Sequence, residues 1–133
     1  MSSTPSTIRP GPDEILGSLV TIVSSAEGEM VFVTCVDEHG YAGDSEAYAS
    51  TDQPKSALPF ELLLQFPKEL EIDTIMVTSR AAAPLDSIAK ADLDFTGDLI
   101  AAAAGEGIQV LDHVLVRDGQ HLRLRDHTDL WNQ

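Results

Sequence analysis

The hydrophobic positions along the chain follow two different periods, and this pattern predicts both helices and strands. Residues 13–25 carry apolar side chains every three or four positions, which is typical of a helix that buries one face. Residues 56–66 repeat this spacing before Pro67, so we expect a second helix that ends there. Residues 91–106 predict a third helix, which a pair of glycines ends.

Shorter apolar runs rich in β-branched residues predict the strands. They are residues 29–36, 41–50, 71–78, 108–117 and 121–125. Turn residues separate the first two runs, and Asp118-Gly119 separates the last two, so we expect two hairpins. The order α-β-β-α-β-α-β-β predicts an α/β (mixed α+β) fold, in which helices flank a mixed β-sheet.

The length of 133 residues fits one domain. Residues 1–12 are rich in Ser, Thr and Pro, so we expect a flexible N-terminal tail before a domain that spans residues 13–133. We find no apolar run of about 18 residues and no apolar signal core, so we expect neither a membrane span nor a secretion signal. The one cysteine, Cys35, lies in an apolar run and reads as a small buried hydrophobe. These features predict a cytoplasmic protein.

Charge changes the picture of possible partners. The chain has 22 Asp and Glu residues against 8 Lys and Arg residues, which gives a formal net charge of −14. Such a field repels the phosphates of nucleic acids and the surface of anionic membranes. We therefore expect no direct binding to nucleic acid or membrane. A basic protein partner and an acidic mimic of DNA both stay open.

Residues 107–119, GIQVLDHVLVRDG, together with QHLRLRD at 120–126, resemble the end of RadC-type MPN/JAB domains. The family pattern there is a GI-x-VLDH run, three β-branched positions and a DG turn. The resemblance covers about residues 13–131 and implies an MPN/JAB-like, cytidine-deaminase-like fold. The structural motif residues that it implies are Asp112, His113, Asp118 and Gly119.

In that family a His-x-His pair and a later Asp hold zinc, and a Glu in the earlier hairpin acts as general acid and base. By this resemblance Thr78 and Arg80 stand where the two histidines are expected, and Asp92 corresponds to the Asp ligand. Asp44 or Glu46 corresponds to the Glu. A hydroxyl is a poor zinc ligand, and a guanidinium carries a charge that repels the metal. The resemblance therefore implies a degenerate site with no catalytic residues, no metal and no cofactor.

Three hypotheses about function follow. The leading one is a catalytically inactive RadC-like MPN/JAB domain that binds a protein partner or forms a homodimer. The second is a metal-dependent hydrolase of the peptidase or isopeptidase type, with an unusual carboxylate site at Asp44, Glu46 and Asp92. The third is an acidic decoy that imitates DNA, which only the net charge supports.

Other side chains give narrower expectations. His113 follows Asp112 in a strand, so we interpret it as a hydrogen-bonded structural residue. Arg80 is expected to supply a positive charge beside Asp92 and Asp44 or Glu46, in place of a metal. Near the C-terminus, an exposed apolar patch is expected from Leu122, Leu124 and Trp131.

Overall fold

The computed structural model describes residues 12–25, 29–40, 42–50 and 58–132. The predicted tail over residues 1–12 lies outside the described residues, apart from Pro12, which begins the first helix. The described elements are α1 (Pro12–Ser25), β1 (Glu29–Val36), β2 (Ala42–Ser50), α2 (Phe60–Glu69), β3 (Thr74–Arg80), α3 (Lys90–Gly105), β4 (Gln109–Arg117) and β5 (Gln120–Arg123), followed by the 3-10 turns η3 (Leu124–Asp126) and η4 (Leu130–Asn132).

The strands form a single mixed sheet in the order β2-β1-β3-β4-β5. The strands β3 and β4 run parallel, and α3 is the crossover that connects them. The other neighbouring strands are antiparallel. The predicted mixed α/β class and the predicted element order are both confirmed.

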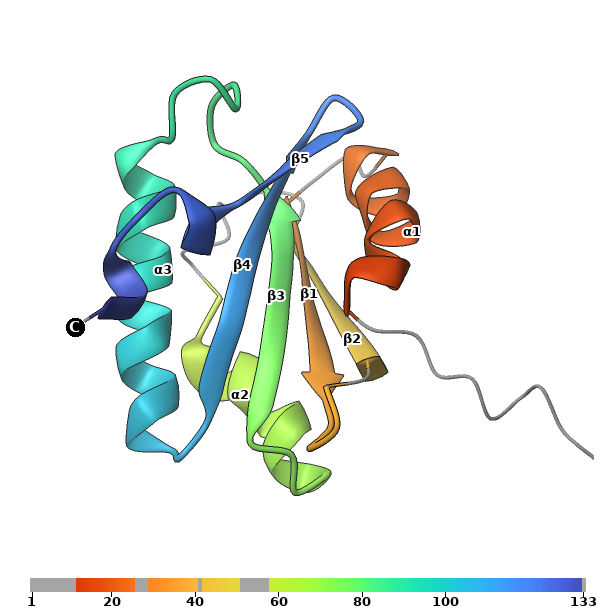
Figure 1. Ribbon diagram of the computed structural model, residues 1–133, viewed down its shortest axis with the longest axis vertical. Helices are drawn as coiled ribbons and strands as arrows, with labels where there is room; N and C mark the ends of the chain where they lie inside the picture. Colours follow the sequence, from red (N-terminus) through yellow and green to blue (C-terminus); the bar gives the residue numbers. More distant parts are fainter. Residues whose placement is uncertain (1–11, 26–28, 41, 51–57, 133) are drawn as a thin grey trace, which may run out of the picture.

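The helices cover the two faces of the sheet unequally (Figure 1). We name the side that α2 and α3 cover the α2–α3 face, and the opposite side the α1 face. Successive residues of a strand point to opposite faces. The core of the α2–α3 face includes Val31, Val33, Ile75, Val77 and Val110, packed against Leu63, Phe95 and Leu99. The core of the α1 face includes Val36, Met76, Val114 and Val116, packed against Leu16, Leu19 and Val23.

The prediction that Pro67 ends the second helix is wrong. The helix α2 passes through Pro67, whose side chain is buried, and ends at Glu69. Pro67 cannot donate an intrahelical hydrogen bond, and the helix ends two residues after it. Its burial beside Leu63 and Leu64 favours helical backbone at this position. The helix also begins later than predicted, at Phe60.

Several strand boundaries differ from the predicted ones: β5 ends at Arg123 and not at residue 125, and both ends of β3 have moved. The strand β3 begins at Thr74, because Glu71 has a positive φ of 58° and belongs to the turn after α2. At its other end Ser79 and Arg80 continue the strand, since they pair with Leu115 and Val116 of β4. Because strand residues alternate, the extension places Ser79 on the α2–α3 face and Arg80 on the α1 face.

Candidate functional site

A buried polar cluster joins β3, β4 and α3. Ser79, His113 and Thr96 come from these three elements, and each is 0% exposed. The Oγ atom of Ser79 lies 2.6 Å from Nε2 of His113, and Oγ1 of Thr96 lies 2.6 Å from Nδ1 of the same ring. The ring of Phe95 packs against the imidazole with a centroid separation of 5.6 Å. The cluster therefore sits inside the apolar layer between the sheet and α3.

The hydrogen bonds of this cluster have a defined direction. The hydroxyl of Thr96 donates its single proton to the carbonyl oxygen of Asp92, at 2.7 Å. Thr96 must then accept from Nδ1–H of His113. In a neutral imidazole Nε2 is the acceptor, so the Ser79 hydroxyl donates to it. The order, from serine through histidine to an oxygen acceptor, is the order found in hydrolytic triads.

The burial of Ser79 determines whether this cluster can act as a nucleophilic site. A nucleophile has to reach the carbon that it attacks, and the side chain of Ser79 has no exposed surface. The cluster instead ties two parallel strands to their crossover helix. Ser79 and Thr96 both hydrogen-bond to the ring of His113. The carboxylate of its sequence neighbour Asp112 accepts the backbone N–H of His113, at 2.8 Å, and not the imidazole.

The two positions that the resemblance aligned with zinc-binding histidines belong to the α1 face. Thr78 lies two residues after Met76 of the α1-face core, so its side chain points to the same face, and it is 0% exposed. Its hydroxyl has no hydrogen-bond partner among the described residues. Arg80 donates from Nη2 to the carbonyl oxygen of Val23, at the end of α1, over 3.3 Å.

The expected pairing of Arg80 with Asp44 or Glu46 is wrong. Glu46 lies opposite Val33 of β1. It shares a face of β2 with Tyr48, two residues later, which packs against the α2–α3-face core. Asp44 lines the same side of β2, beside Cys35. Arg80 and these two carboxylates therefore lie on opposite faces of the sheet, because strand alternation separates them.

Asp92 occupies the first turn of α3 and is 1% exposed. Its Oδ2 atom accepts the backbone N–H of Ala82 at 2.8 Å. A carboxylate in the first turn also interacts favourably with the helix dipole. Asp92 thus attaches the segment after β3 to the start of α3.

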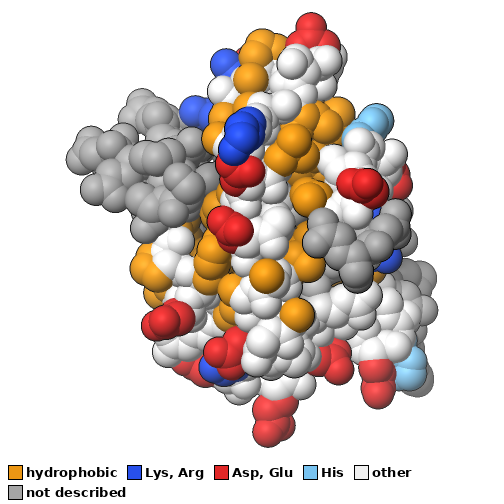
Figure 2. All heavy atoms as spheres, turned by 90° about the vertical axis from the view of Figure 1, so that its left-hand side faces the viewer, with side chains coloured by type: hydrophobic (Ala, Val, Ile, Leu, Met, Phe, Trp, Pro, Cys, Tyr) orange, Lys and Arg blue, Asp and Glu red, His pale blue; other side chains and the backbone are white. Residues whose placement is uncertain are grey.

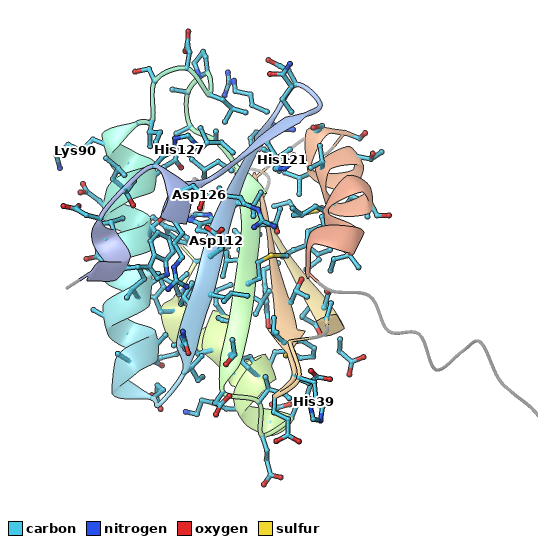
Figure 3. The ribbon with its side chains drawn as sticks, viewed as in Figure 1. His39, Lys90, Asp112, His121, Asp126 and His127 are labelled. Carbon is cyan, nitrogen blue, oxygen red and sulfur yellow. The ribbon has the colours of Figure 1, made fainter. Side chains whose placement is uncertain are left out.

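Potential metal ligands do not gather in the described part of the chain. Within it, no group of three or more His, Cys, Asp and Glu side chains is placed to hold a metal ion. The three carboxylates of the hydrolase hypothesis, Asp44, Glu46 and Asp92, are all described and form no such group. Figure 3 shows His39 at one end of the sheet, with His121 and His127 toward the other. The geometry therefore gives the carboxylate-metal hypothesis no support.

The C-terminal segment covers part of the outer edge of β4. The strand β5 pairs with residues 114–117 of β4, and the segment after it reaches the preceding residues. Nη1 of Arg125 donates to the carbonyl oxygen of Leu111 at 2.9 Å, and the indole N–H of Trp131 donates to that of Val110 at 2.7 Å. Leu124 is 0% exposed. The expected exposed patch of Leu122, Leu124 and Trp131 is therefore wrong, because Leu124 is buried and the other two are half-buried against the small core that it forms with Ala81 and Leu115.

Three motif positions, Asp112, Asp118 and Gly119, have local roles. Asp118 and Gly119 form the turn between β4 and β5 with positive φ angles of 53° and 80°. Oδ1 of Asp112 accepts the backbone N–H of Arg125 at 3.1 Å. Burial raises the pKa of Asp112, and the neighbouring Asp126 carboxylate raises it further, while the N–H donors of Arg125 and His113 partly oppose this. Asp112 and Asp126 lie near each other in Figure 3.

The edge strand β2 carries two exposed acidic residues. Residues 43–47 are all exposed, and they include Asp44 and Glu46. A shallow groove of about 300 Å³ begins at Asp44 and continues to Leu70 and Ile72, after α2. Burial raises the pKa of the Cys35 thiol beside this groove to about 11, and the Asp44 carboxylate contributes to the increase.

Comparison with known proteins leaves the family of the chain open. No protein-family model matches the chain, and no curated protein matches it. The resemblance to RadC-type MPN/JAB domains stays a prediction. Within the described residues, no helix is long and apolar enough to cross a membrane.

Proposed function

We propose that this chain is a non-catalytic protein-interaction domain with an MPN/JAB-like fold and a degenerate metal site. The GIQVLDHVLVRDG run at 107–119 and the mixed sheet flanked by helices support the fold proposal. Its single cysteine, a buried thiol, supports a location in the reducing cytoplasm.

The side chains with catalytic chemistry support the absence of catalysis. Ser79 and His113 are hydrogen-bonded but sealed from solvent. Thr78 and Arg80 face α1, and neither residue type binds a zinc ion well. The described chemistry is therefore used to hold the fold together.

The observation that carries the proposal is the edge strand β2. It spans nine residues and pairs with β1 on one side, at the end of the sheet. A long edge strand presents backbone N–H and C=O groups that another chain can bind. Strand addition at such an edge is a recurring way in which protein domains recognise partners.

The test combines photo-crosslinking with metal analysis. A benzophenone amino acid replaces Ser45 on β2, Ser18 on α1 or Asp98 on α3, one at a time, in cells that make the protein naturally. We expect a discrete adduct with another protein from at least one position. The purified protein should hold far less than one equivalent of zinc after growth with added zinc. The absence of adducts from all three positions would end the proposal, as would one equivalent of zinc that Asp92→Ala removes.

A further inference from the structure

We propose that the outer edge of β2 binds an extended protein segment that carries Lys or Arg at alternate positions, added to the sheet as a new strand. This inference rests on the proposed interaction function and names the chemistry of the partner.

The strand β2 is open on more than its edge. The helix α1 packs mainly on β1, β3 and β4, so it covers little of the α1 face of β2. Residues 43–47 are exposed, and they alternate between the two faces. A chain that pairs with β2 would lie about 4.8 Å away, with its own side chains in register with those of β2.

The charges on β2 favour a basic segment. Asp44 and Glu46 both lie on the α2–α3 face of the strand. Glu46 and Glu69 of α2 act together on Tyr48, whose pKa burial and these two carboxylates raise. Opposite charges on neighbouring strands stabilise the pairing, and like charges oppose it. Basic side chains two residues apart on an added strand would face this row of carboxylates.

Shape adds a second preference at one end of the strand. Leu70 is 42% exposed and lines the groove of about 300 Å³ next to Asp44, together with Ile72. An added strand that continues past Asp44 would bring a side chain to this groove. We therefore expect an apolar residue near one end of the basic segment.

The same charges disfavour a second copy of this chain as the occupant. In an antiparallel pair of β2 strands centred on Glu46, the two Glu46 side chains would face each other. A register shift of two residues, which centres the pair on Ser45, would place Asp44 opposite Glu46 instead. Each copy also carries a formal net charge of −14. Edge strands commonly carry charges that prevent such self-pairing.

If Asp44 and Glu46 only prevented β2 from pairing with a second copy, a basic peptide would not add to this strand. A peptide experiment separates this protective role from partner binding. The probes are the synthetic peptides Val-Lys-Val-Lys-Val-Lys-Val and Val-Glu-Val-Glu-Val-Glu-Val, titrated into the isotope-labelled full chain. We expect the lysine peptide to shift and protect backbone amides of β2 and its neighbour β1, as measured by NMR and hydrogen exchange. We expect the glutamate peptide to bind at least tenfold more weakly.

Charge reversal supplies the matched controls. The double variant Asp44→Lys/Glu46→Lys should bind the lysine peptide at least tenfold more weakly and should gain binding to the glutamate peptide. Because acidic side chains also spread over the α2–α3 side of the molecule (Figure 2), general attraction has to be measured separately. The control Asp86→Lys/Asp98→Lys makes the same charge change at exposed positions on other elements, and it should weaken binding less than threefold.

A lysine peptide N-methylated at alternate residues keeps its charge but loses strand hydrogen bonds, and it should not protect β2. Equal binding by both double variants, equal binding of the N-methylated peptide, or no binding would each overturn the inference. Adducts at Ser18 or Asp98 combined with no peptide binding at β2 would overturn this inference alone. No adduct at any position would remove the proposed function itself.

Discussion

The substitution of valine for threonine at two buried positions tests whether the hydrogen bonds of the polar cluster stabilise the fold. Thr96→Val and Thr78→Val each replace a hydroxyl with a methyl group at a site that is 0% exposed. The hydroxyl of Thr96 accepts from His113 and donates to Asp92, whereas that of Thr78 has no hydrogen-bond partner among the described residues. The volume change is nearly the same, so the difference between the variants reports hydrogen bonding.

The expected effects have opposite signs. Thr96→Val leaves the Nδ1–H of His113 buried without an acceptor, which costs about 1–3 kcal/mol of unfolding free energy. Thr78→Val removes a buried hydroxyl with no partner and fills its place with a methyl group, so it should stabilise by about 1 kcal/mol. Valine and threonine have similar helix propensities, so the position of Thr96 in α3 adds little to the difference.

Urea unfolding followed by circular dichroism measures both variants, with the slope m checked against the parent chain. We expect the unfolding free energies of the two variants to differ by roughly 2–4 kcal/mol, with Thr78→Val the more stable. Equal destabilisation by both substitutions would refute the assignment. So would a neutral Thr96→Val, because the imidazole would then need no acceptor at that position.

Further predictions concern single groups. The Cys35 thiol, whose pKa burial raises to about 11, should not react with iodoacetamide at pH 8 in the folded chain but should label fully in urea. Because burial raises the pKa of Asp112, ionisation of this group destabilises the folded state, so its contribution to stability is present at acid pH and is lost as the pH rises through the raised pKa. Asp112→Asn should therefore gain stability relative to the parent chain between pH 4 and pH 7 in unfolding titrations, and a constant difference would contradict this. Trp131→Phe, which removes the hydrogen bond to Val110, should cost about 1 kcal/mol and speed amide exchange in the C-terminal turns, and unchanged exchange would count against this role.

The fold could be predicted from the sequence because period and turn chemistry agree along most of the chain. The α-helical stripe of residues 13–25 and the run before Asp118-Gly119 each favour one structure. The boundaries that failed depend on tertiary contacts. Pro67 lies inside α2 with its side chain buried, and Ser79 continues β3 because β4 lies beside it.

The site could be predicted only in part. The resemblance grouped Asp44, Glu46, Thr78, Arg80 and Asp92 around one point, but strand alternation puts Arg80 on the opposite face from Asp44 and Glu46. Successive residues of a strand point to opposite faces. The sequence alone could therefore have placed Thr78 and Ser79 on different faces of β3, with Ser79 on the same face as Val77.

No role for Ser79 or Thr96 was predicted from the sequence, because a single serine or threonine forms no recognisable sequence motif. The meeting of these two hydroxyls with His113 depends on the parallel pairing of β3 with β4 and on the path of α3 between them. No local window of the sequence contains all three residues. Their spatial arrangement becomes visible only once the crossover is built.

The sheet ends at β2 on one side and at the short strand β5 on the other. The part of β4 that β5 does not pair with is covered in a way that β2 is not, and this difference is the strongest argument for the proposed partner site. Along β4, Arg125 and Trp131 occupy two carbonyl groups that β5 does not reach. Along β2, the residues at the edge are exposed, and Asp44 and Glu46 supply charge where β4 has hydrogen-bond donors. Charge opposes pairing with an identical edge but favours pairing with a basic one, so it leaves β2 selective. A chain that only needed to protect this edge could cover it as β4 is covered, and we therefore expect a monomer whose β2 edge accepts a basic partner strand.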